Sequence, residues 1–296
     1  MMREEALLKV EHLCQKFGKA DAVKDVSFEV RKGEVFGLVG ESGCGKTTTG
    51  RCVMGLYPIT SGEIFFEGRA IGKRKKAEKA IQMIFQDPLA SLDPRMTVKE
   101  IIAEGLIVGG EKNKEEIEQK VLSVLDMVGL QRQYAGRYPH EFSGGQRQRI
   151  GIARAIIMEP KLLIADEPLS ALDVSIQAQI INLLNDLRKK LGLTILFVAH
   201  DLAVVKYFSD RIAVMRSGRI LELAPSEELF EHPLHPYTRS LLSAIPIPDP
   251  RRERKRVRIA YVPLPEDEGR RLRQVGQEHF VYCNEEEYGN YLKMIQ

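Results

Sequence analysis

A glycine-rich segment early in the sequence contains the residue types that bind phosphate. Positions 40–47 carry Gly, four further residues, Gly, Lys and Thr. Glycines let successive backbone N–H groups converge on phosphate oxygens, the lysine reaches the outer phosphates of a nucleotide, and the hydroxyl that follows can ligate Mg²⁺. We therefore expect this phosphate loop to bind a nucleotide through Gly40, Ser42, Gly43, Cys44, Gly45, Lys46, Thr47 and Thr48.

Two adjacent carboxylates, Asp166 and Glu167, provide the further groups that hydrolysis needs. They follow an apolar run at 162–165, and the ligands of parallel sheets bind at the C-terminal ends of the strands. Asp166 would hold Mg²⁺ through water, whereas Glu167 would polarise the attacking water. Two acids after a strand more often cap a helix. Beside a phosphate loop, however, they indicate hydrolysis of a nucleotide.

The spacing of apolar residues predicts the elements that position these groups. Alternation and short apolar runs predict strands at 23–30, 34–39, 60–68, 161–165, 193–199 and 212–216. Helical periodicity predicts helices at 46–56, 98–106, 114–128, 146–157 and 174–191. Strands that alternate with helices favour a largely parallel sheet. The helix after the phosphate loop would direct the positive end of its dipole at the phosphates.

Two parts of the chain depart from this alternation. Residues 92–159 are predominantly helical in pattern and are interpreted as a helical insert. After Ala224, prolines are frequent, at positions 225, 233, 236, 246, 248, 250, 263 and 265. Because proline interrupts both helices and strands, we expect an appended tail with little regular structure.

Composition excludes several classes of protein. The 296 residues include 44 Lys plus Arg against 41 Asp plus Glu, a net charge of +3, and 44% are hydrophobic. A disordered or collagen-like chain is therefore excluded, and nucleic acid is not the expected partner. No stretch approaches the roughly 18 apolar residues of a membrane-spanning helix, and the acidic start disfavours a secretory signal. The scattered Cys14, Cys44, Cys52 and Cys283 indicate reduced thiols of a cytosolic protein.

A serine and two glycines at the expected start of another helix narrow the class. The segment Phe142–Gln146 opens this helix and forms a second anion-binding N-terminus. It resembles the signature of ATP-binding cassette ATPases, which usually begins with Leu rather than Phe. The other motifs of that family also occur in order, namely Gln86 in 85–88, the segment 170–173 after the acidic pair, and His200 in 198–201.

The resemblance implies a fold and a division into domains. The expected fold is α/β, with a P-loop NTPase core of the RecA type, a mixed and largely parallel sheet, an inserted helical subdomain and a C-terminal proline-rich extension. Residues 1–91 and 160–230 would form the catalytic core, 92–159 the helical signature subdomain, and 231–296 the extension.

The resemblance also implies a role for each motif. Two subunits would bind head to tail, so that the phosphate loop of one faces the signature of the other, which here comprises Ser143, Gly144, Gly145 and Gln146. His200 would contact the γ-phosphate, Asp173 would connect the two sites, and Phe17 would stack on adenine unless it only packs in the core. The catalytic set would be Glu167, His200, Gln86 and Lys46, and the Mg²⁺ set Thr47, Gln86 and Asp166.

Longer segments narrow the resemblance further. Residues 85–97, 165–179 and 232–239, with Gln146, are similar to the second of the two ATPases of oligopeptide and dipeptide importers. This implies ATP and Mg²⁺ as ligands, a companion ATPase in a heterodimer or a second copy in a homodimer, two transmembrane permease subunits, an extracytoplasmic solute-binding protein acting indirectly, and a place on the cytoplasmic face of the cell membrane. An importer of nickel or another small solute, and a non-transport cassette such as a carbon–phosphorus lyase accessory protein, remain alternatives.

The tail departs from the importer pattern. Members of that family commonly carry several closely spaced cysteines in this region, associated with an iron–sulfur cluster, whereas this tail contains only Cys283. One thiolate cannot hold a cluster that typically needs four ligands. We therefore predict that the protein has no iron–sulfur cluster.

Overall fold

The computed structural model describes residues 5–71, 79–246, 250–253, 256–263 and 269–295. The strands are β1 (Ala6–Phe17), β2 (Ala20–Arg31), β3 (Val35–Val39), β4 (Ser61–Phe66), β5 (Arg69–Ala70), β6 (Ile81–Ile84), β7 (Leu162–Asp166), β8 (Thr194–Ala199), β9 (Arg211–Arg216), β10 (Arg219–Pro225), β11 (Arg271–Gly276) and β12 (His279–Cys283). The helices are α1 (Lys46–Val53), α2 (Val98–Val108), α3 (Lys114–Met127), α4 (Gly144–Ile156), α5 (Val174–Leu191), α6 (Leu202–Phe208), α7 (Ser226–Glu231), α8 (Pro236–Ser243), α9 (Pro250–Glu253) and α10 (Glu285–Ile295), with 3₁₀ helices η1 (Arg132–Gly136) and η2 (Pro139–Glu141).

The central sheet has eight strands in the order β11-β12-β10-β9-β3-β8-β7-β6. The strands from β9 to β6 run parallel, and β10, β12 and β11 continue the sheet antiparallel beyond β9. Parallel neighbours end at the same edge, so the phosphate loop after β3, the acidic pair at the end of β7 and His200 after β8 all reach that edge. The prediction of an α/β core with a mixed, largely parallel sheet is confirmed.

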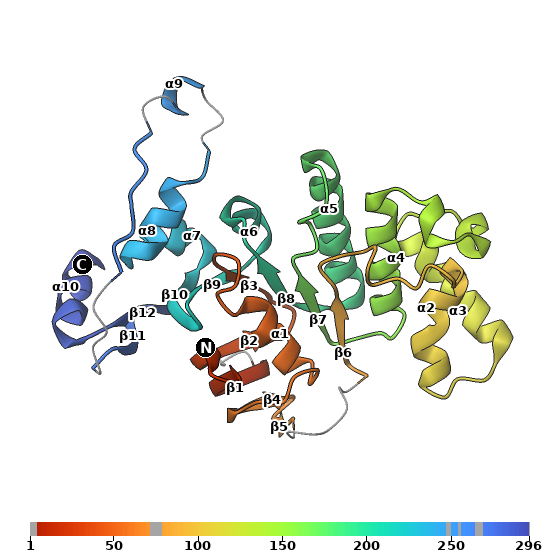
Figure 1. Cartoon of the computed structure of the whole chain (residues 1–296), viewed down its shortest axis with the longest axis horizontal. Coiled ribbons are helices and arrows are strands. Elements are labelled where there is room, and N and C mark those ends of the chain that lie inside the picture. Colours follow the sequence, from red (N-terminus) through yellow and green to blue (C-terminus); the bar gives the residue numbers. More distant parts are fainter. Residues whose placement is uncertain (1–4, 72–78, 247–249, 254–255, 264–268, 296) are drawn as a thin grey trace.

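Strand β3 shows how the sheet is buried between two layers (Figure 1). All five of its residues are buried, as expected for a central parallel strand. Val35 and Val39 join the apolar cluster on the side of α5 and α6. Phe36 and Leu38 point the opposite way, because side chains alternate along a strand, and join the cluster with α1 and a second, antiparallel sheet. That sheet has the order β2-β1-β4-β5.

Helices α2, α3 and α4 follow β6 and precede β7, and they lie together at one end of the molecule (Figure 1). Thr97 begins α2 with a capping box, in which its hydroxyl accepts from Glu100 N and the Glu100 carboxylate accepts from Thr97 N. The Asn113 side chain caps α3 by accepting hydrogen bonds from Glu115 N and Glu116 N. Ile102 of α2 and Leu125 of α3 are fully buried. This unit falls within the predicted helical subdomain, whose boundaries stay a prediction.

The segment after Ala224 is more regular than its prolines predict. It forms α7, α8, α9, β11, β12 and α10, and β12 extends the central sheet by pairing with β10, where Val281 lies opposite Glu222. The expectation of little regular structure is wrong because prolines occur where helices begin. Pro225 precedes α7, and Pro236 is the first residue of α8, positions where a missing N–H is tolerated.

A buried hydrogen-bonded pair joins β12 to β10. His279 Nε2 lies 2.8 Å from Glu222 Oε1, and the two side chains are 1% and 0% exposed. The same carboxylate accepts the backbone N–H groups of Leu234 and His235 at 2.8 and 3.0 Å. The second ring nitrogen of His279 lies 3.4 Å from Glu228 Oε1 on α7. One buried carboxylate therefore links β10, β12 and the loop before α8.

Removing the His279 side chain is expected to loosen β12. His279→Ala leaves the buried Glu222 carboxylate without one of its partners, which costs about 2 kcal/mol of local stability. Hydrogen exchange of the β12 amides should accelerate accordingly, by about thirtyfold. His232→Ala is the control, because the His232 side chain is 63% exposed. Wild-type exchange rates in β12 of the His279→Ala protein would contradict this role.

Every strand and helix expected from apolar spacing is present, with ends that differ by at most a few residues. Parts of the predicted core (1–4 and 72–78) and of the predicted extension (247–249, 254–255, 264–268 and 296) lie outside the described residues. Among the helices that the structure describes, none has the length and apolar character needed to cross a membrane.

Candidate functional site

The phosphate loop connects β3 to α1 and is tightly packed at two of its glycines. Gly40 and Gly45 have φ angles of 154° and 110°. A Cβ atom on Gly40 would lie 2.1 Å from Met215 O, and one on Gly45 would lie 2.4 Å from Ala22 O. A side chain at either position would collide with backbone. Gly43 has a φ of 77° without such crowding, so its conformation alone favours glycine.

The other residues of the loop differ in exposure. Ser42 is exposed, Cys44 is buried, and Thr47 and Thr48 are half-buried in the first turn of α1. Burial raises the pKa of the Cys44 thiol, although the nearby Lys46 opposes the rise. The first turn of α1, all of it described, carries no acidic side chain. Its N–H groups and helix dipole therefore favour an anion.

Lys46 connects the phosphate loop to the acidic pair. Its side chain is only 3% exposed, so its charge requires partners. The Nζ atom donates to Gly40 O at 2.8 Å and to Glu41 O at 3.0 Å, and it lies 3.6 Å from Glu167 Oε1. The ammonium is thus held between the loop and the end of β7.

Asp166 and Thr47 form a site whose chemistry fits Mg²⁺. Asp166 is fully buried, and its Oδ1 accepts the Thr47 hydroxyl at 2.7 Å. Its Oδ2 is buried and has no hydrogen-bond partner among the described residues. Burial raises the pKa of the Asp166 carboxyl, and the Thr47 hydrogen bond opposes this. A carboxylate with an unused oxygen beside a hydroxyl is a hard, oxygen-rich ligand set of the kind Mg²⁺ prefers.

The backbone of Glu167 is held in an unusual conformation. Its φ is 44°, which for a residue other than glycine costs on the order of 1 kcal/mol. Its N–H donates to Val198 O at 2.9 Å, and its carbonyl accepts the Ser170 hydroxyl at 3.0 Å. Backbone strain of this kind is concentrated at functional sites.

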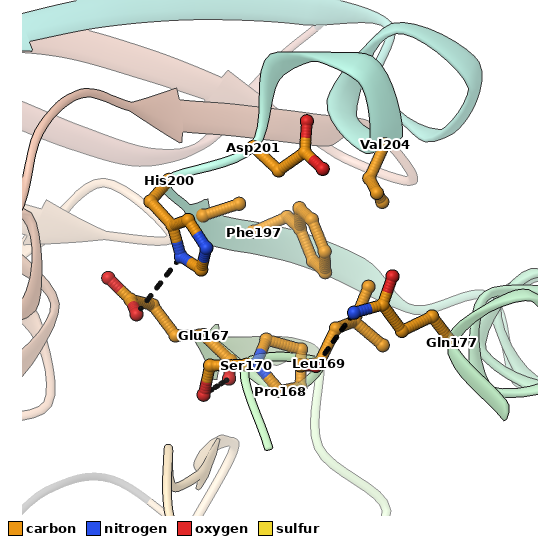
Figure 2. A pocket seen from close by; sticks show the side chains of 10 residues that line it. Glu167, Pro168, Leu169, Ser170, Gln177, Phe197, His200, Asp201 and Val204 are labelled. Carbon is orange, nitrogen blue, oxygen red and sulfur yellow. Dashed lines mark hydrogen bonds and ion pairs between the residues drawn. The ribbon is translucent and has the colours of Figure 1, made fainter. Parts of the chain in front are cut away.

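The Glu167 carboxylate brings the predicted catalytic residues together. Gln86 Nε2 donates to its Oε2 at 3.1 Å, and His200 Nδ1 lies 3.3 Å from the same oxygen. Figure 2 shows the adjoining pocket, with Glu167 and His200 on one side and the apolar Phe197 and Val204 on the other. With Lys46 on its other oxygen, Glu167 contacts all three remaining members of the predicted catalytic set. The catalytic and binding roles of these residues remain predictions.

The signature residues do not meet the phosphate loop of the same chain. Figure 1 places α4 apart from α1, with β6 and β7 between them. Ser143 caps α4 through two reciprocal hydrogen bonds: Gln146 N donates to Ser143 Oγ at 3.4 Å, and Ser143 N donates to Gln146 Oε1 at 3.0 Å. Gly144 and Gly145 are the first two residues of α4, and a Cβ on Gly145 would lie 2.7 Å from Ile176 Cγ2.

Two other predicted residues lie at the surface. Asp173 is exposed at the start of α5, and its side chain forms no capping bond to any described residue. Phe17, at the end of β1, is 47% exposed. Its ring contacts Tyr57 edge to face, with centroids 5.2 Å apart. Sequence reasoning missed Tyr57, because nothing in the local pattern relates residue 57 to residue 17.

Two regions of the chain match known protein families. Residues 23–170 match the family described as ABC transporter, and residues 221–269 match that described as oligopeptide/dipeptide transporter, C-terminal region. The oligopeptide transport ATP-binding protein OppF of Bacillus subtilis (strain 168) is 56% identical over 96% of this chain and 98% of its own length. The dipeptide transport ATP-binding protein DppF of Lactococcus lactis subsp. cremoris (strain MG1363) is 54% identical over 99% of each. The structure of cbiO1 from Clostridium perfringens, part of the ABC transporter complex cbiONQ, has a TM-score of 0.70 and 31% identity over 77% of this chain and 92% of that one.

Proposed function

The chain belongs to the ABC transporter family and, within it, to the oligopeptide/dipeptide transport ATP-binding proteins, and from that membership we propose that it hydrolyses ATP to drive a peptide importer. One observation carries the proposal of hydrolysis. The side chains of Gln86, His200 and Lys46 all contact the Glu167 carboxylate. It stands beside the Thr47–Asp166 pair, at the edge of the sheet where ligands bind.

Each residue then has a definite task. Glu167 accepts a proton from the attacking water, Gln86 and His200 orient the carboxylate and that water, and Lys46 offsets the charge of the outer phosphates. Thr47, Asp166 and Gln86 would hold Mg²⁺, whose charge, when bound, stabilises the transferred phosphoryl group. Phe17, beside Tyr57, offers an exposed ring on which adenine can stack.

The distance of α4 from the phosphate loop supports a head-to-tail dimer. Ser143 and Gly145 lie at the start of α4, and Figure 1 shows α4 apart from α1, the helix that follows the phosphate loop of the same chain. In the proposed dimer they face the phosphate loop of a second ATPase, and the exposed Asp173 lies at the interface. We infer that the second ATPase is a different, companion chain, with a homodimer as the alternative.

Membership of this family places the chain in a complex with a membrane permease and a partner ATPase. The proposed complex has two permease subunits and an extracytoplasmic binding protein that acts indirectly, with this chain peripheral on the cytoplasmic face. In the proposed domain division, 1–91 and 160–230 form the core, 92–159 the signature subdomain and 231–296 the extension. Nucleic acid is not a proposed partner.

The chemistry of Cys283 supports the proposal that the extension carries no iron–sulfur cluster. Burial raises the pKa of its thiol to about 11, and the thiolate is the form that binds metals. Within the described residues, no group of three or more His, Cys, Asp or Glu side chains is arranged to hold a metal ion.

Peptide transport is tested by restoring uptake in cells. In a strain that lacks this chain, the wild-type protein should restore uptake of labelled di- and oligopeptides, and Lys46→Ala should restore less than about a hundredth of it. The Lys161→Ala protein, altered at an exposed surface pair, is the control and should restore uptake fully. Restored uptake of nickel without peptide, or co-purification with soluble enzymes instead of permeases, would contradict the proposal.

A further inference from the structure

The aromatic ring proposed to stack on adenine lies at the end of a hairpin that packs against the phosphate loop. Phe17, the last residue of β1, pairs with Ala20 at the start of β2. Two residues further along β2, the Ala22 carbonyl packs closely on Gly45, where a Cβ atom would lie 2.4 Å from the carbonyl oxygen. Only a few residues therefore connect Phe17 to the loop that would hold the phosphates.

Tyr57 restrains the exposed Phe17 ring. A side chain that is 47% exposed keeps rotamer freedom, and a ligand that orders it must offset the lost entropy. The Tyr57 ring meets Phe17 with centroids 5.2 Å apart and an angle of 82° between the planes, which is a favourable edge-to-face geometry. Such a contact occupies at most one face of the Phe17 ring. The contact thus restrains the ring and leaves room for a base.

Arg51 anchors Tyr57 to the last turn of α1. The Arg51 Nη1 atom donates to the Tyr57 hydroxyl at 2.7 Å, and Tyr57 N donates to Arg51 O at 3.3 Å. The Arg51 Nε atom is buried and has no hydrogen-bond partner among the described residues. Because a buried donor without a partner lowers stability, the Tyr57 hydroxyl matters as an acceptor for this guanidinium.

Thr60 holds the segment that carries Tyr57 against β1. Thr60 N donates to Cys14 O at 2.9 Å, and Lys16 N donates to the Thr60 hydroxyl oxygen at 3.0 Å. Backbone and side chain of one threonine thus connect the segment after α1 to the last residues of β1. These bonds keep Tyr57 beside Phe17.

We propose that Tyr57 is a positioning residue for adenine, which, anchored by Arg51, holds the Phe17 ring in place for stacking on the base. Helix α1 then serves both ends of the nucleotide, because Lys46 in its first turn faces the phosphates and Arg51 in its last turn fixes Tyr57. The inference rests on the proposed function, since it requires that ATP binds with adenine on Phe17. Tyr57 touches no reacting atom, so it affects affinity rather than the rate of hydrolysis.

The test measures nucleotide binding by the full-length Tyr57→Leu protein, which keeps an apolar side chain against the neighbouring core cluster. We expect the Kd for a non-hydrolysable ATP analogue to rise about fivefold, the size of a lost edge-to-face contact, and kcat to change by less than about twofold. The inhibition constant of inorganic triphosphate with Mg²⁺ should also change by less than about twofold, because triphosphate has no base.

Tyr282→Leu is the matched control. Tyr57 and Tyr282 are both half-buried, and each ring centroid lies 5.6 Å from a guanidinium, that of Arg51 and that of Arg219 respectively. The control protein should bind the ATP analogue with wild-type affinity. Thermal midpoints of both variants show whether each is folded.

A double-mutant cycle separates positioning from packing. If Tyr57 acts through Phe17, adding Tyr57→Leu to Phe17→Ala should weaken binding of the ATP analogue no further. Tyr57→Phe keeps a ring beside Phe17 but loses the hydrogen bond from Arg51, so its Kd should lie between those of the wild type and Tyr57→Leu. A structural role alone would weaken binding of the analogue and of triphosphate together, and would do so in the Phe17→Ala background as well.

The outcomes separate this inference from the proposed function. An unchanged Kd in Tyr57→Leu, or equal losses of affinity for the ATP analogue and for triphosphate, overturns the positioning role and leaves the phosphate site standing. Wild-type affinity in Phe17→Ala would show that adenine does not stack on Phe17, which also overturns it. If the wild-type protein itself fails to bind the analogue, both the proposed function and the inference fall.

Discussion

Replacing Glu167 by Gln is expected to slow ATP hydrolysis by about a thousandfold while ATP binding remains intact. The amide occupies the space of the carboxylate and keeps a hydrogen-bonding oxygen for Gln86, but it cannot accept the proton of the attacking water. Lys46 loses only its 3.6 Å contact with Glu167 and retains the carbonyl oxygens of Gly40 and Glu41. Phosphate release and equilibrium binding of ATP, measured on the same preparation, check the two halves of this expectation.

The same variant should persist as a closed dimer when ATP is present, alone or with its companion chain. Adding Ser143→Arg to Glu167→Gln should abolish the dimer but leave ATP binding by the single chain, because α4 would meet the nucleotide of the other subunit. Glu118→Gln is the control, since Glu118 forms only an exposed pair with Lys99. Turnover near that of the wild type in Glu167→Gln would refute Glu167 as the base.

Replacing Lys46 by Ala is expected to raise the Kd for ATP by about a hundredfold. The substitution removes a charge-assisted interaction with the outer phosphates, worth about 3 kcal/mol, and 1.4 kcal/mol corresponds to a tenfold change in affinity. Titration with a non-hydrolysable ATP analogue gives the Kd directly.

The controls for Lys46 address its structural contacts. Lys46→Ala also frees the carbonyl oxygens of Gly40 and Glu41, so the thermal midpoint and circular dichroism must show that the protein is folded. Lys46→Met, which keeps the apolar stem, should lose affinity to a similar extent. An unchanged Kd in both variants would show that Lys46 does not bind the phosphates.

The sequence was sufficient for those parts of the site whose residues are neighbours. The spacing of Gly40, Gly45 and Lys46 indicates a phosphate loop because the chemistry depends on consecutive backbone N–H groups. Asp166 and Glu167 could be placed at a strand end because an apolar run precedes them. Their encounter with Gln86 and His200 was available only through resemblance, since it depends on three separate strands ending at one edge.

What the sequence did not reveal depends on contacts across the fold. The strand content of β12 is weak in isolation, and it is stabilised by the burial of His279 against Glu222. The prolines suggested irregular structure because the sequence alone does not show where the helices begin. Pro225 and Pro236 prove to lie at helix starts, where proline is tolerated. The hydrogen bond from Gly218 N to Cys44 O in the phosphate loop joins segments about 170 residues apart, and no local pattern reports such a contact.

The order of strands in the central sheet has a consequence for protein synthesis. Strand β3 and its phosphate loop leave the ribosome early, yet β3 pairs with β8, about 160 residues later, and with β9. Strand β10 in turn gains β12 about 60 residues after its own synthesis. A nascent chain therefore contains the phosphate loop before β8 and β9 are available to pair with β3. Long-range strand pairing of this kind forms slowly. ATP binds only the assembled phosphate loop, whose Cys44 carbonyl accepts Gly218 N from the turn between β9 and β10. The nucleotide should therefore stabilise only those chains in which β9 and β10 have already paired, and so shift late folding intermediates toward the native state.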